Sequence, residues 1–197
     1  VAGRDAWTLA GWFDYLDLRL NGNAFHQQLM AGEVPYTDAR VKKVYTTWKQ
    51  LLDAGYFIDN SLSYDLDAAQ PFLFQGKAAM MLMGTFITGG FSPTVKSEMG
   101  YFQFPIIDPN VPTAEDGPVE TLNIPAKAKN KADAHAFLAF AETPEIGALL
   151  GKGLGSLSAN SKSPEPEDPI SKIGFQILPN PKGGSAQFYD RAMTKEM

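Results

Sequence analysis

The chain has 197 residues, of which 44% are hydrophobic and 20% are charged, and its net charge is -5 at neutral pH. These values exclude wholesale disorder, and the scattered Lys and Arg residues argue against a surface for nucleic acid or anionic membrane. The absence of Cys excludes disulfides and thiolate chemistry, and no apolar run reaches the roughly 18 residues of a membrane span.

The first 74 residues contain four predicted helices. Apolar residues recur at helical spacing from Asp5 to Leu20, and a short helical piece runs from Phe25 to Met30. A third helix begins at the N-cap Asp38 and ends at Gly55, and a fourth runs from about Asp65 to Phe74. Trp48 lies in the apolar stripe of the third helix, so we expect it in the core.

The stretch from Phe72 to Phe86 organises the chain. The apolar run Ala78–Met83 predicts a strand buried on both faces. Gly84 lets the backbone turn sharply, so that Thr85 and Phe86 reach a rim at the carboxyl end of that strand. Such rims are where open α/β sheets bind ligands.

This stretch carries a resemblance to a known family. Phe-Gln-Gly-Lys-Ala-Ala-Met, with Gly-Thr-Phe three residues later, resembles the signature of the family 1 extracellular solute-binding proteins, the sugar-capturing receptors of ABC importers. In that family the segment lies in the carboxyl-terminal lobe, and the aromatic residue after the glycine stacks on the sugar. The resemblance implies that Phe86 takes this place, where Trp is commoner, with less stacking area and no indole donor.

The middle of the chain predicts two further strands and a loop. The strands are Tyr101–Phe104, ended by Pro105, and Val119–Pro125, in which apolar and polar residues alternate. The segment Ile107–Gly117 is rich in turn-forming and acidic residues, so we expect it to be a surface loop.

Four more helices are predicted after the strands. Asn130 caps a helix with Ala134, Phe137, Leu138 and Ala141 on its inner face, and Thr143-Pro144-Glu145 begins another that runs to about Leu150. This pair is similar to a second motif of the same receptor family, whose helices belong to the amino-terminal lobe. Gly151, Gly153 and Gly155 lack the order of a phosphate loop. Helix resumes from Ile170 to Leu178, and a loop over 179–189 enters a final helix.

The resemblance implies a sugar site of aromatic platforms and polar partners. The platforms are Trp12, with Trp7 as the neighbouring candidate, Phe86, and Phe188, with Tyr189 behind it. A position in the core is the alternative for both tryptophans. The remaining candidates are Asp14, Gly84, Thr85, Glu120, Thr121 and Gln187.

We therefore expect an α/β fold of the type II periplasmic-binding kind, represented mainly by its helix-rich carboxyl-terminal lobe. Residues 1–121 and 158–197 should belong to that lobe, and residues 122–157 to the amino-terminal lobe. Much of the amino-terminal lobe should be absent, so the fragment should bind ligand weakly or not at all.

The expected function is capture of a carbohydrate and its delivery to the permease subunits of an ABC importer, in the periplasm or outside the cell. We expect a monomer when intact, with no cofactor and no nucleic acid as a partner. We also expect no metal site and no catalytic residue, because His26 and His135 stand alone without ligand spacing and the acids lie in no recognisable catalytic setting. One alternative is a glycoside hydrolase fragment using Asp14, Glu120 or Asp190. Another is the same fold binding a polyamine or a metal chelate, which the aromatic rim with few acids disfavours.

Overall fold

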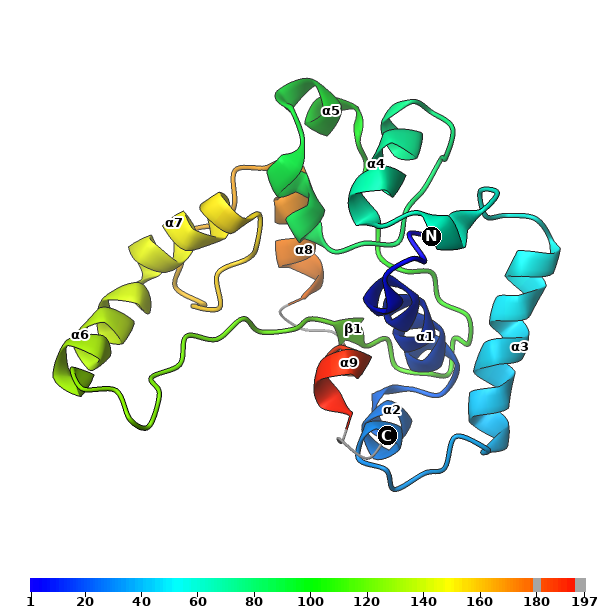
Figure 1. Cartoon of the computed structure of the whole chain (residues 1–197), viewed down its shortest axis with the longest axis horizontal. Helices are drawn as coiled ribbons and strands as arrows, with labels where there is room; N and C mark the ends of the chain where they lie inside the picture. Colours follow the sequence, from blue (N-terminus) through cyan, green and yellow to red (C-terminus); the bar gives the residue numbers. More distant parts are fainter. Residues whose placement is uncertain (179–181, 194–197) are drawn as a thin grey trace. The chain divides into compact units, whose positions relative to one another are not determined.

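The computed structural model describes residues 1–178 and 182–193, and most of its regular structure is helical (Figure 1). The chain forms two compact units. The first contains residues 1–83, 103–118 and the described residues from 182 onward, and the second contains residues 84–102 and 119–178.

The elements of the first unit are α1 (Ala6–Leu20), α2 (Asn23–Met30), α3 (Ala39–Asp53), the 3-10 turn η1 (Ser61–Ser63), α4 (Leu66–Phe74), β1 (Glu115–Asp116), β2 (Ser185–Ala186) and α9 (Tyr189–Ala192). Those of the second are the 3-10 helix η2 (Thr85–Gly90), α5 (Pro93–Glu98), α6 (Lys131–Ala141), α7 (Pro144–Leu154) and α8 (Pro169–Ile177).

Helix α1 is the centre of the first unit, and it packs against α2 and α3. Its inner face carries Phe13, Leu16 and Leu20, which are buried together with residues of α2 and α3 such as Leu29 and Val41. The four helices predicted in this part of the sequence are confirmed. Of the expected N-caps, Asp38 accepts a hydrogen bond from the Arg40 amide at 2.8 Å, whereas the side chains of Asn130 and Thr143 make no cap bond. Asp65 forms a further cap, accepting from the Ala68 amide at 2.8 Å.

The predicted strand over Ala78–Met83 is wrong. The segment forms no ladder in the described chain, and Met80 is 70% exposed. The segments Tyr101–Phe104 and Val119–Pro125 are likewise irregular, not strands. An apolar run indicates a tendency to be buried, but a strand exists only where another segment offers its own N–H and C=O groups.

The two strands in the described part of the chain come from segments predicted to be loops. β1 and β2 pair in parallel, with Glu115 opposite Ser185 and Asp116 opposite Ala186. Ala114, Glu115 and Asp116 are buried, so the expected surface loop over Ile107–Gly117 was wrong at its carboxyl-terminal end. This short pairing anchors the segment that precedes α9.

In the second unit, η2 lies against α7 and α8. The predicted starts of α6 and α7 at Asn130 and Thr143 are confirmed, but α7 continues to Leu154 and ends at Gly155, whose φ of +66° is the left-handed conformation that favours glycine. Phe137, expected on an inner face, is 59% exposed. No helix in the described ranges has the length and apolar character needed to cross a bilayer.

Candidate ligand-binding site

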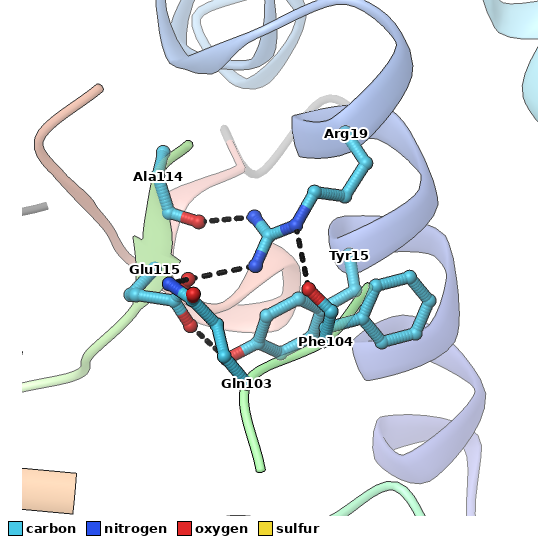
Figure 2. A network of polar contacts seen from close by, with 6 residues as sticks. All are labelled: Tyr15, Arg19, Gln103, Phe104, Ala114 and Glu115. Carbon is cyan, nitrogen blue, oxygen red and sulfur yellow. Dashed lines mark hydrogen bonds and ion pairs between the residues drawn. The ribbon is translucent and has the colours of Figure 1, made fainter. Parts of the chain in front are cut away.

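A buried Arg19 ties two separate segments, residues 103–104 and 114–115, to the helix α1 (Figure 2). Its Nε donates to the carbonyl of Phe104 at 3.1 Å, another guanidinium nitrogen donates to the carbonyl of Ala114, and Nη2 pairs with Glu115 at 2.7 Å. Tyr15 and Gln103 donate to the same carboxylate, at 3.2 and 2.8 Å. Because both charges are paired and hydrogen-bonded, this ion pair tolerates burial and fixes the backbone beside β1.

A second buried polar cluster contains Asp14 and Asp17 of α1. Asp14 is fully buried at 0% exposure, and its Oδ2 accepts the backbone N–H of Tyr189 at 3.1 Å. Asp17 is also buried, and it bonds His26 Nδ1 at 2.9 Å and Asn21 Nδ2 at 2.7 Å. Asp14 therefore anchors α9 to α1, while Asp17 holds α2.

Burial has a large effect on the acids of this cluster. Desolvation raises the pKa of Asp14 to about 7, although the hydrogen bond from Tyr189 opposes the shift. Desolvation, followed by the charge of Asp14, raises the pKa of Asp116 to about 8. The carboxyl groups of Asp14 and Asp116 lie within hydrogen-bonding reach of each other, so they titrate as a pair.

The segment that carries Gln187 and Phe188 is held from both sides. The Gly117 amide donates to the Ala186 carbonyl at 3.1 Å, and the Tyr189 amide donates to Asp14. Gln187 is exposed, and Phe188 is half-buried with the Arg191 guanidinium 5.8 Å from its ring centroid. These anchors restrict the backbone that would present both side chains to a ligand.

The two predicted tryptophans differ in their surroundings. Trp12 is stacked on Trp48 at 6.3 Å between ring centroids, and it meets the rings of Phe57 and Phe104 edge to face at 5.1 and 5.9 Å. Trp12 thus packs against the apolar core. A core position was the predicted alternative to stacking on a ligand. Trp7 is half-buried in the first turn of α1.

In the second unit, three predicted site residues lie together on η2. A Cβ on Gly84 would come within 2.6 Å of the Phe86 ring, so the glycine lets this ring fold back over the backbone. The Thr85 methyl group lies where a Cβ on Gly174 would be, only 2.6 Å away, and Phe86 remains 38% exposed. The Phe86 ring therefore lies over Gly84 and keeps accessible surface.

Glu120 and Thr121 lie on an exposed segment without regular structure. Thr121 Oγ1 accepts a hydrogen bond from Asn123 Nδ2 at 3.0 Å. The structure thus brings Gly84, Thr85 and Phe86 together, and separately Asp14 with the backbone beside Phe188. In the described part of the chain, no three His, Asp or Glu side chains gather closely enough to hold a metal ion.

Sequence reasoning missed the charged residues that support this arrangement. The sequence pattern does not single out Arg19, and it predicts Glu115 and Asp116 as part of a surface loop. One signal was available: Arg19 lies between Leu18 and Leu20 on the inner part of an amphipathic helix, and a buried Arg needs an acidic partner. Nothing in the local sequence identifies that partner as Glu115.

Comparisons with known proteins agree on one family. The model of the bacterial extracellular solute-binding protein family matches residues 1–148. An uncharacterized ABC transporter extracellular-binding protein of Pyrococcus horikoshii is 26% identical over 180 residues, which are 90% of this chain and 40% of the relative. A second such protein of the same organism is 32% identical over 84 residues, which are 42% of this chain and 19% of the relative.

A solved structure is similar over almost the whole chain. It is the bacterial solute receptor AcbH, described as having an exclusive substrate preference for β-D-galactopyranose. The TM-score is 0.81 at 28% identity, over 99% of this chain and 50% of the receptor. The chain spans half or less of the length of each of these proteins.

The predicted resemblance and fold class are therefore confirmed, because the family model covers most of the chain and the similar fold is that of a solute receptor. The chain belongs to the family of bacterial extracellular solute-binding proteins and carries part of their α/β periplasmic-binding fold.

Proposed function

We propose that the protein to which this chain belongs is the sugar receptor of an ABC importer, and that its ligand is a hexopyranose related to β-D-galactopyranose. The observation that carries this proposal is the similarity to a galactopyranose receptor over 99% of the chain, at a TM-score of 0.81. The receptor would work outside the cytoplasmic membrane, in the periplasm or outside the cell, and would deliver its sugar to permease subunits.

The chemistry of η2 supports a sugar over a polyamine or a metal chelate. A pyranose has an apolar C–H face that stacks on an aromatic ring, and Phe86 offers a partly exposed ring whose position is fixed by Gly84. Phe188, with the exposed Gln187 beside it, is the proposed second contact. Thr85, Glu120 and Thr121 are proposed polar partners, and Trp7 is a further aromatic candidate.

Asp14 and Trp12 take supporting roles in this proposal. Asp14 is buried, and one of its carboxylate oxygens accepts the Tyr189 amide. It would therefore position the Phe188 segment and would not contact the ligand directly. Trp12 would stabilise the same unit through its contacts with Trp48 and Phe57.

We also propose that residues 122–157 belong to the amino-terminal lobe of the whole receptor, and residues 1–121 and 158–197 to the other lobe. The exposed apolar side chains of α6 and α7, among them Phe137, Phe140, Leu149 and Leu154, support a further packing partner for these helices. Closure of two lobes on the sugar would then produce the form that the permease recognises.

A glycoside hydrolase is the less supported alternative. Hydrolysis needs two carboxyl groups held roughly 5 to 10 Å apart around a substrate. Asp14, one of the acids considered for this role, is buried and in contact with Asp116. The family and the two relatives are solute-binding proteins of transporters.

Titration calorimetry of the intact receptor tests the proposal, with D-galactose, D-glucose, maltose and putrescine as probes and thin-layer chromatography of the same mixtures. Saturable binding of a hexose that is recovered unchanged is the expected result. Binding of putrescine alone would reject the sugar, and cleavage of maltose would reject the receptor in favour of the hydrolase.

A further inference from the structure

A cluster of buried acids lies at α1, apart from the aromatic residues proposed to bind sugar. Asp14, Asp17, His26 and Asp116 are all buried, and they come from α1, α2 and β1. Two more acids, Glu115 of β1 and Asp190 of α9, act on Asp116 electrostatically. The cluster thus gathers more negative groups than positive ones.

The basic side chains of this cluster already have partners. Arg19 is paired with Glu115 at 2.7 Å, and His26 Nδ1 bonds Asp17 at 2.9 Å. The other ring nitrogen of His26 lies 4.0 Å from Asp14 Oδ1, beyond hydrogen-bond distance. No cation among the described residues pairs with Asp116, and a buried carboxylate without a partner is costly.

The surroundings of the two acids determine which one carries a proton. Asp14 receives the Tyr189 amide and faces His26, and both favour its anionic form. In the described chain, neither oxygen of Asp116 has a hydrogen-bond donor, and Oδ1 of Asp14 also lacks one. Two ionised carboxylates only accept hydrogen bonds, whereas a protonated Asp116 would supply the missing donor to Asp14.

We propose that Asp116 is held in its protonated form and donates its carboxyl hydrogen to Asp14, so that one proton locks the segment Gly184–Tyr189 against α1 and β1. The lock lies between two anchors of this segment. On one side the Glu115 and Gly117 amides donate to the carbonyls of Gly184 and Ala186, at 3.2 and 3.1 Å, and on the other side Asp14 holds Tyr189.

Loss of the proton places two negative charges in contact inside the protein and drives β1 and α1 apart at this point. Because Gln187 and Phe188 lie on the locked segment, sugar affinity should fall when the proton is lost. This consequence alone rests on the proposed function. The raised pKa values of Asp14 and Asp116 place the change near pH 7 to 8.

Hydrogen–deuterium exchange of the intact receptor, followed by mass spectrometry between pH 6 and 9, tests the lock. The readout is the protection of a peptide covering residues 182–193, relative to the same peptide unfolded, alongside D-galactose affinity in the same buffers. The variant is Asp116→Asn, whose amide donates to Asp14 at every pH. The control is Asp59→Asn, which neutralises an exposed acid of the same unit.

In the wild type and in Asp59→Asn, we expect protection to fall by up to about tenfold per pH unit above the pKa of the pair, while Asp116→Asn stays flat. A wild type without this fall, or a fall unchanged in Asp116→Asn, would overturn the lock. If the variant does not fold, the wild type is unfolded with urea at pH 6 in weak buffer and the pH is followed. Release of protons on unfolding supports the lock, and unfolding without proton release rejects it.

The affinity readout separates the two proposals. If protection follows the expected pattern but no galactose binds at any pH, the lock stands and the proposed ligand fails. If galactose binds with an affinity that is constant from pH 6 to 9, the ligand stands and the lock does not control it.

Discussion

The backbone N–H of Tyr189 donates a hydrogen bond to Oδ2 of Asp14 over 3.1 Å, which joins two residues 175 positions apart. The bond fixes the start of α9 on α1, and it does so inside the protein because Asp14 is fully buried. The position of Phe188, the residue before Tyr189, therefore depends on a side chain near the beginning of the chain.

Replacing this acceptor should destabilise the first unit. Asp14→Ala leaves the Tyr189 amide without a partner, at a cost of about 1–3 kcal/mol in the free energy of unfolding. Asp14→Asn keeps a carbonyl acceptor and should lose less. Urea unfolding followed by tryptophan fluorescence measures both, and equal losses in the two variants would show that the hydrogen bond is unimportant.

The buried pair of Arg19 and Glu115 should respond asymmetrically. Arg19→Met leaves Glu115 buried without its cation, and we expect a loss of about 3–5 kcal/mol in unfolding free energy. The double variant Arg19→Met, Glu115→Gln removes the stranded charge and should recover part of that loss. A double variant that is no more stable than Arg19→Met would contradict the electrostatic explanation.

Two glycines near the end of α7 form a matched pair for testing the support of η2. Gly155 has φ of +66°, and a Cβ there would lie 2.8 Å from the Phe86 carbonyl oxygen, so Gly155→Ala should destabilise the second unit and shift η2. Gly153 is helical with nothing within 4 Å of its Cβ position, so Gly153→Ala should stabilise α7 by about 0.5–1 kcal/mol. Thermal unfolding of both variants checks this opposite sign.

Removing the Phe86 ring should weaken sugar binding without unfolding the receptor. An aromatic stacking contact contributes about 0.5–1.5 kcal/mol, so Phe86→Ala should raise the dissociation constant by about two- to tenfold. Phe102→Ala removes another exposed ring of the same unit and is the control. Calorimetry with D-galactose measures the effect, and equal affinities for Phe86→Ala and the control would remove Phe86 from the site.

Stability should decrease as pH rises through the neutral range. The folded pKa values of Asp14 and Asp116, about 7 and about 8, lie above the ordinary value of the unfolded chain. The folded state therefore binds more protons than the unfolded one between about pH 4 and 8, and stability falls there by up to about 1.4 kcal/mol per pH unit for each proton.

Other acids do not reverse this sign in that range. The Arg40 side chain lowers the pKa of Asp38 to about 2, so the stability that Asp38 contributes is constant above about pH 4 and is lost only as the pH falls below that. Urea midpoints at pH 5, 6, 7 and 8 provide the measurement, with Asp116→Asn expected to show a smaller slope. Stability that rises from pH 5 to 8 would disagree with buried, protonated acids.

The sequence by itself determined most of the helices and where they begin, although η2 and α5 were not predicted. Asp38, Asp65 and Asp168 each accept a backbone N–H two or three residues further on, and the apolar faces of α1 and α2 follow from spacing alone. It also supported the family, since the motif ending at Phe86 and the helix starts at Asn130 and Thr143 were readable without coordinates.

The tertiary structure alone decided the strands and the buried charges. The run Ala78–Met83 was predicted to be a strand but forms no ladder with another described segment. Glu115–Asp116 was predicted to be in a loop but pairs with Ser185–Ala186 as a strand. Arg19 meets Glu115 across 96 positions of sequence. Helices and caps close hydrogen bonds within a few residues, so a local pattern specifies them. Ladders and buried ion pairs are completed by segments far along the chain, and only the folded protein shows which segments those are.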